Sequence, residues 1–305
     1  MTRHDPAALG VFLLVSFGLA WLVALPLWLG DGLASPWFLP VSAAMMFTPA
    51  IGALSSALLV DRPGSRREVL RSLGIWPLPR AGRLIGYAAL AVVVPAALVL
   101  VALPIGAVLG VYPADLTGLS GFREVLSAQL TASGSPPPPF PLWVLVVLQL
   151  VSIPVGALVN TIPAAGEEIG WRGWLLPRLL PLGTVPAILV SGIAWGFWHA
   201  PLILLGYNYP LAPGWLGVLA MTGMCTVVGA VFAWLRIRSE SVWPAALAHG
   251  SLNAAAGSYV LFAQAGALVD TTQATVLGWT GWIAPVVLIG ILAATGRFRR
   301  PAPTS

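Results

Sequence analysis

Long apolar runs dominate this sequence and leave the chain few ways to fold. Eight of them reach the roughly 20 residues that an α-helix needs to cross a bilayer core of about 30 Å, at approximately residues 10–29, 37–60, 84–110, 142–166, 184–206, 214–235, 241–262 and 274–296. Only helices and closed barrels satisfy the backbone hydrogen bonds in lipid, and runs of this length favour helices. We therefore expect an all-α, polytopic membrane protein with about eight transmembrane helices.

The composition extends this expectation to the whole chain. Hydrophobic residues make up 58% of the sequence and charged residues 8%, whereas soluble domains have about 45–50% and about 25%. No segment is polar enough to form a second, soluble domain. Residues 1–305 are predicted to form a single integral membrane domain, whose partner is the lipid bilayer and not nucleic acid.

The arginines predict an orientation for this domain. All 15 basic residues are arginine, and Arg123 is the only one on the side of the membrane opposite the arginine-rich segment 61–83. Because positive loops stay inside, we expect a multi-pass protein of the cell membrane with both termini in the cytoplasm. A ninth span through residues 167–183 would reverse this pattern, so that segment is expected to be a short helix that lies in the interface or dips into the bilayer.

The stretch "AAGEEIGWRGW", residues 164–174, gathers ionisable groups in a chain that has few of them. Glu168 and Arg172 are four residues apart, on one helix face, and are predicted to form an ion pair. Glu167 points about 100° away from Glu168. A carboxylate that is buried without a partner costs several kcal/mol, so Glu167 is a candidate functional residue.

Two histidines, His199 and His249, lie deep in apolar runs, and Asn253 follows His249 by one helical turn. Each has a structural explanation, as a packed side chain or an interhelical hydrogen bond. Ionisable groups within the membrane nevertheless indicate a functional site. A glutamate near a histidine can activate water, and a histidine and an asparagine can stabilise an oxyanion. The set is suited to amide hydrolysis, whereas Cys225 has no charged neighbour that would activate it as a nucleophile.

Three motifs carry a resemblance to a known family. "EEIGWR" is similar to the E-E-x-x-x-R motif of the CPBP family, which includes CAAX prenyl endopeptidases and Abi-type bacterial proteins. "WGFWH" matches its aromatic–histidine motif, with Trp195 in a place that is usually phenylalanine, and "HGSLN" matches H-x-x-x-N. The motifs occur in the family's order. The resemblance covers about residues 40–262, with the motif-bearing core at about 142–262.

The resemblance implies an intramembrane endopeptidase whose helices enclose a polar cavity open to the cytoplasm. Its substrate would be a peptide or protein at the membrane, in some relatives a lipidated one. The implied catalytic residues are Glu167 and Glu168, with Glu167 and His199 activating water, and His249 and Asn253 binding the oxyanion. Arg172 and Trp195 are then expected to support the site structurally.

Other readings of the same residues stay open. A zinc-dependent metalloprotease would use Glu167, His199 and His249 as ligands, although the metal-free mechanism, which needs no cofactor, is favoured. A non-proteolytic immunity or binding protein could keep the same fold. A transporter would also bury glutamate and histidine, but the inverted repeats that many transporters contain are not found in the sequence.

Overall fold

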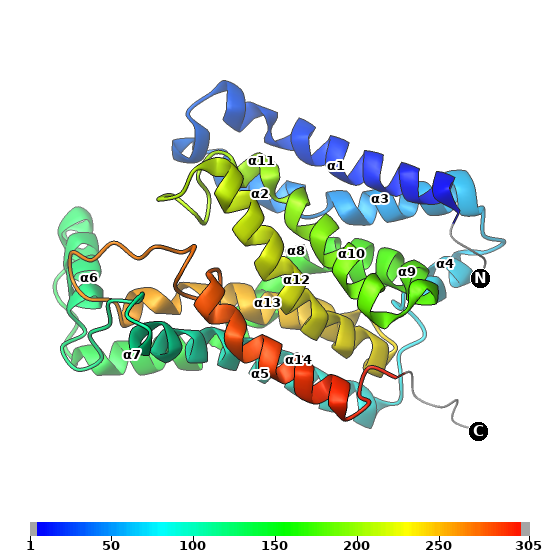
Figure 1. Cartoon of the computed structure of the whole chain (residues 1–305). Helices are drawn as coiled ribbons and strands as arrows, with labels where there is room; N and C mark the ends of the chain where they lie inside the picture. Colours follow the sequence, from blue (N-terminus) through cyan, green and yellow to red (C-terminus); the bar gives the residue numbers. More distant parts are fainter. Residues whose placement is uncertain (1–4, 300–305) are drawn as a thin grey trace.

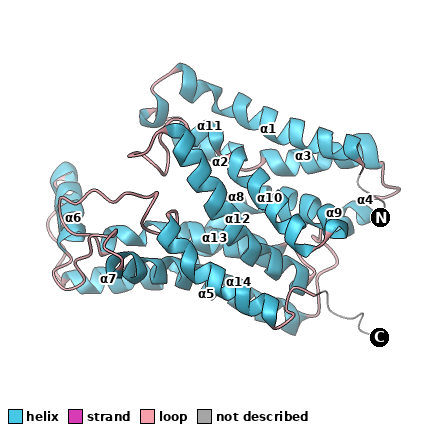
Figure 2. Cartoon of the chain, viewed as in Figure 1, coloured by secondary structure: helices cyan, strands magenta, loops and turns pink. Residues whose placement is uncertain are grey.

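The computed structural model describes residues 5–299, and this range is helical without a strand (Figure 2). The two terminal arginines used in the orientation argument, Arg3 and Arg300, lie outside it. The helices are α1 Pro6–Leu29, α2 Phe38–Met45, α3 Thr48–Ser56, α4 Arg66–Ser72, α5 Ala81–Val108, α6 Ser120–Ser133, α7 Leu142–Val151, α8 Ile153–Glu168, α9 Leu176–Leu179, α10 Thr184–Trp198, α11 Ala200–Ile203, α12 Gly214–Ser239, α13 Trp243–Ala256 and α14 Ile283–Ala294. Short 3-10 or π-helical turns extend several of them.

Among the described residues, four helices are long and apolar enough to cross a membrane: Pro6–Leu29, Phe38–Asp61, Ala81–Val108 and Gly214–Ser239. The bent pair formed by Leu142–Val151 and Ile153–Leu182 makes a fifth if it is one broken span. Two shorter apolar helices, Thr184–Trp198 and Trp279–Ala294, fall inside the fifth and eighth predicted spans, and the seventh contains the 14-residue α13. The chain is a multi-pass membrane protein.

The segment 167–183 was predicted from the balance of arginines to be a short helix that lies in the interface or dips into the bilayer. It continues α8 through a π-helical turn, Ile169–Leu175, into α9, and every residue of that turn except Ile169 is buried. The charge of Arg172 is paired with Glu168, 2.8 Å away. The place of the segment relative to the membrane stays a prediction.

Figure 1 shows which segments lie at the two ends of the helix bundle. The beginning of α1, the end of α14 and the short helix α4 lie at one end, and α6 lies at the other. Helices α1, α5 and α14 run along the bundle in the direction that joins these ends. The orientation that the arginines predicted stays a prediction.

Helices α8, α10, α12 and α13 form the interior that holds the candidate site. Helix α13 packs mainly against α8 and α5, and α10 packs mainly against α12. Glycines permit the closest approach: a Cβ on Gly196 of α10 would lie 2.3 Å from the Cα of Thr222, and one on Gly250 of α13 would lie 2.5 Å from the carbonyl of Ala157. Small residues at helix contacts are typical of membrane bundles.

Candidate active site

The glutamate pair lies at the end of α8. The glycines on either side of it, Gly166 and Gly170, pack against residues around the start of α3. A Cβ on Gly166 would lie 2.7 Å from the carbonyl of Met46, and one on Gly170 would lie 2.4 Å from the Cβ of Pro49. The pattern G-E-E-I-G therefore fixes the two carboxylates from both sides. Both are buried, with Glu167 2% and Glu168 0% exposed.

Glu168 is the centre of a buried charge network. Its Oε1 accepts a hydrogen bond from Nη1 of Arg172 at 2.8 Å and one from Nδ1 of His249 at 3.0 Å. The predicted pairing of Glu168 with Arg172 is confirmed. A buried pair of this kind is strongly destabilised when one partner is removed, so Glu168 and Arg172 hold each other, and Glu168 also orients the imidazole of His249.

Glu167 has a different partner. Its Oε2 accepts a hydrogen bond of 2.6 Å from the indole N–H of Trp195 on α10. The same indole ring lies beneath the guanidinium of Arg172, whose Cζ is 4.2 Å from the ring centroid. No hydrogen bond joins Oε1 of Glu167 to another described residue, so this oxygen keeps its capacity to accept a proton or a hydrogen bond.

His199 follows α10 directly and is half-buried. Its Nδ1 is 2.9 Å from the carbonyl of Trp195. A carbonyl only accepts hydrogen bonds, so Nδ1 carries the proton and Nε2 of the neutral ring is an acceptor. Cys225 lies 3.9 Å from the same ring and is buried and free.

His249 lies between two aromatic rings, Phe232 at 5.7 Å and Trp195 at 5.2 Å between centroids. Asn253, one turn further along α13, is exposed and forms no hydrogen bond with the rest of the described chain. Its amide is thus accessible from outside the packed interior. The structure brings Asn253 onto the helix of His249 but does not bond it to either glutamate.

Trp195 links these groups. Its indole N–H donates to Glu167, and its ring lies 5.8 Å from the ring of His199, one helical turn later. The same ring contacts His249 edge-on and stacks beneath the guanidinium of Arg172. The glutamates, the two histidines and Arg172 therefore gather around one side chain, although they come from three segments that are far apart in sequence. Whether they also share a polar cavity stays a prediction.

The comparisons with known proteins bear on the same part of the chain. Residues 137–255 match the family model described as "Type II CAAX prenyl endopeptidase Rce1-like". This segment, less than half of the chain, is similar to that family. It contains Glu167, Glu168, His199, His249 and Asn253. No curated protein matches the chain at a significant level.

This match agrees with the resemblance drawn from the motifs. The matched model describes CAAX prenyl endopeptidases, which are hydrolases. The matched residues begin near the start of α7 and end near the last turn of α13. They therefore include α8, α10, α12 and α13, the four helices that surround Trp195.

Some residues of this site had no signal in the sequence. Phe232 stacks on His249 but is one of many apolar residues in its run. Tyr207, in the loop after α11, lies near enough to Glu167 to feel its charge: burial raises the pKa of the phenol, and the negative charge of Glu167 raises it further. Trp195 was expected to form a wall, and the role of its N–H was missed.

The residues that would bind zinc do not form a ligand set. Between Asp5 and Arg299, no three His, Cys, Asp or Glu side chains are grouped so that they could hold a metal ion. The carboxylates of Glu167 and Glu168 are turned toward Trp195 and Arg172, and Nδ1 of His199 is turned toward a backbone carbonyl. The zinc alternative does not fit this arrangement, and no catalytic step is assigned to a metal.

Proposed function

We propose that the chain is an intramembrane endopeptidase that hydrolyses a peptide bond of a membrane-associated substrate, with Glu167 as the general base. The observation that carries this proposal is the position of Glu167, a buried carboxylate that is oriented by a single hydrogen bond from Trp195. One of its oxygens is held and the other is free to take a proton from water. A base that is positioned in this way contributes typically 10²–10⁴-fold to a rate.

The two histidines have different roles in this proposal. His199 uses its unprotonated Nε2 to hold the water, since Nδ1 donates to the carbonyl of Trp195. His249 donates Nδ1–H to Glu168, so it can donate to an oxyanion only from Nε2–H of the charged imidazolium. Glu168 is the counter-ion of that imidazolium. Asn253 supplies the second oxyanion donor from its exposed amide.

The roles of the glutamates separate accordingly. Glu167 acts on water, whereas Glu168 is a positioning residue that acts through His249. Arg172 balances the charge of Glu168 and fixes the face of Trp195. These assignments support one reaction: Glu167 takes the proton of water, the resulting hydroxide attacks the carbonyl carbon, and the proton then passes to the leaving amine.

The proposal includes the finer architecture. Eight spans form a single membrane domain over residues 1–305, with both termini in the cytoplasm and a polar cavity open to that side. The bent helix pair, the two shorter apolar helices and α13 supply the spans beyond the four long ones. The substrate is a peptide or protein segment at the membrane, and lipidated peptides are the first class to screen because of the family match.

The decisive experiment is peptide cleavage by the purified chain in a bilayer, with a library of membrane-proximal and lipidated peptides. Glu167→Gln keeps the size of the side chain and removes the basic oxygen, so cleavage should fall by at least about two orders of magnitude. Asn253→Ala should lower it by about 10²–10³-fold. Glu124→Gln on α6 is the matched control and should cleave like the wild type.

Cleavage by Glu167→Gln at the wild-type rate would end this mechanism. Substrate uptake without cleavage, in either form, would indicate a transporter, and binding without cleavage an immunity or binding protein. A chelator added to the same assay should leave the rate unchanged. Loss of activity that zinc restores would instead establish the metalloprotease alternative.

A further inference from the structure

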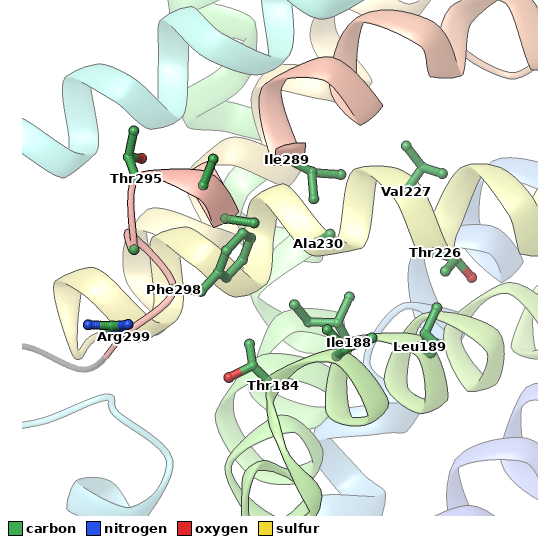
Figure 3. Close-up of a pocket in the computed structure, with 14 residues that line it drawn as sticks. Thr184, Ile188, Leu189, Thr226, Val227, Ala230, Ile289, Thr295, Phe298 and Arg299 are labelled. Carbon is green, nitrogen blue, oxygen red and sulfur yellow. The ribbon is translucent and has the colours of Figure 1, made fainter. Parts of the chain in front are cut away.

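A groove of about 620 Å³ lies between α10, α12 and α14, near the start of α10 and the end of α14 (Figure 3). Its walls are mainly apolar and include Ile188, Leu189, Val227, Ala230, Ile289 and Phe298. Its volume is within the range of about 300–1,000 Å³ that is typical of ligand sites.

The groove is separate from the candidate active site, because α12 lies between them. Gly229 and Phe232 of α12 contact Arg172 and His249 on the side of the glutamates. Val227 and Ala230 of the same helix line the groove. A molecule in the groove therefore occupies different space from a substrate at Glu167.

The groove opens toward the side of the molecule. Val185 and Leu189 on its α10 wall are 67% and 46% exposed, and Ala293 and Ala294 on its α14 wall are also exposed. In a multi-pass membrane protein, apolar side chains exposed at the flank of a bundle contact lipid. Hydration of an apolar groove is unfavourable. An acyl chain of the surrounding bilayer is therefore the expected occupant.

Positive charge at one end of the groove favours a lipid with an anionic headgroup. Arg299 lines the groove, and Arg297 lies two residues before it; both are exposed, and neither forms an ion pair within residues 5–299. Arg238 contacts the same segment, since its Nη1 donates to the carbonyl of Arg299 at 3.1 Å. The guanidinium of Arg299 at the end of an apolar groove complements a phosphate group, and basic residues beside membrane helices attract anionic lipids.

We propose that this groove is a binding site for an anionic phospholipid, with one acyl chain between α10 and α14 and the phosphate at Arg297 and Arg299. The site rests on the membrane location of the chain and on the geometry of α10, α12 and α14. It does not depend on the endopeptidase mechanism. A failure of either proposal leaves the other standing.

The test is lipid binding to the purified full chain in detergent, followed by native mass spectrometry during titration with phosphatidylglycerol or phosphatidylcholine. We expect one phosphatidylglycerol to bind saturably and more tightly than phosphatidylcholine. An arginine near an anionic headgroup contributes about 1 kcal/mol, so Arg299→Ala should weaken binding about fivefold. Arg67→Ala, an exposed arginine on α4, is the matched control and should bind as the wild type does.

A second variant tests the acyl-chain half of the site. Val227→Phe places a ring in the groove from α12 and should reduce binding of both lipids equally, whereas Arg299→Ala should reduce that of phosphatidylglycerol more than that of phosphatidylcholine. Equal binding of the two lipids by the wild type would overturn the headgroup assignment. Unchanged binding by Val227→Phe, or by Arg299→Ala, would overturn the site. Arg299 is exposed, so the arginine variant stays informative if the phenylalanine variant does not fold.

Discussion

Trp195 makes a contact at the scale of single residues that phenylalanine cannot reproduce. The two rings are both aromatic walls, but only indole has an N–H, and here that N–H is bonded to Glu167 at 2.6 Å. A hydrogen bond to a charged group contributes about 1.5–3 kcal/mol. In this chain the tryptophan therefore orients the proposed base as well as shaping the space beside it.

Trp195→Phe should accordingly lower kcat by about 10- to 100-fold, with a small change in KM, because the carboxylate loses its orientation while the wall remains. Steady-state peptide cleavage separates the two constants. Trp171→Phe is the control: Trp171 is also fully buried, but its indole N–H has no hydrogen-bond partner. A larger change in KM than in kcat for Trp195→Phe would assign the ring to substrate binding alone.

Sequence spacing predicted the contacts of residues on one helix and not those between helices. Glu168 and Arg172 are one turn apart, so helix geometry alone was sufficient for their pairing. Glu167 and Trp195 are separated by 28 positions, and their contact depends on how α8 packs against α10. The spacing of residues within one helix does not specify how that helix packs against another.

Close packing of α10 against α12 sets the position of Trp195 and His199 at the scale of elements. A Cβ on Gly192 would lie 2.6 Å from the Cα of Thr226, and one on Gly196 would lie 2.3 Å from that of Thr222. Both contacts involve backbone atoms, which a rotamer change cannot relieve. The helices must separate to accept any larger side chain.

Gly196→Ala should therefore destabilise the bundle by about 1–3 kcal/mol, the usual cost of overpacking, and should lower cleavage by moving His199. Thermal unfolding in detergent measures the first effect. Gly18→Ala on α1 is the matched control, since a Cβ there meets nothing within 4 Å. Equal melting temperatures for the two variants would show that α10 and α12 are not held by this contact.

The start of α6 provides a pH-dependent prediction. Asp115 is bonded to the side chain of Ser120 and to backbone N–H groups of Gly118 and Ser120, and these bonds lower the pKa of its carboxyl group. A lowered folded-state pKa means that the stabilisation is complete above the ordinary value of about 3.9 and is lost as the pH falls through the folded-state pKa.

Asp115→Ala should thus speed hydrogen exchange at the start of α6 at neutral pH, with rates corrected for their intrinsic pH dependence. The difference from the wild type should disappear in acid, as the wild-type carboxylate becomes protonated. Asp31→Ala should have no such effect, because the Asp31 side chain caps no backbone group in η1, Gly32–Ala34. A difference that persists in acid would assign it to a cause other than the carboxylate.

The apolar runs predicted the elements well where helices are long and straight. Residues 10–29, 37–60, 84–110 and 214–235 correspond to the four long candidate spans. Residues 167–183 were placed by the balance of charge, and their position relative to the membrane stays a prediction; in the structure Arg172 forms a buried ion pair within the bundle. Hydropathy treats each charge separately and does not register such a pair.

Orientation is a property of the whole molecule and can be tested directly. Removing Cys225, the only cysteine, allows single cysteines to be placed at either end. Arg67→Cys on α4 should react with an impermeant maleimide only after cells are opened, whereas Ser127→Cys on α6 should react in intact cells whose surface is accessible. The reverse pattern would invert the topology and move both termini outside.

Helix α12 is closely packed on one face and lines a groove with the other. On the side of the glutamates, a Cβ at Gly229 would lie 2.6 Å from Nη2 of Arg172. On the other side lies a groove of about 620 Å³. A close-packed interior resists added volume, so a larger side chain on α12 is accommodated less easily beside Arg172 than beside the groove. The two faces of one helix therefore differ in how much substitution they tolerate.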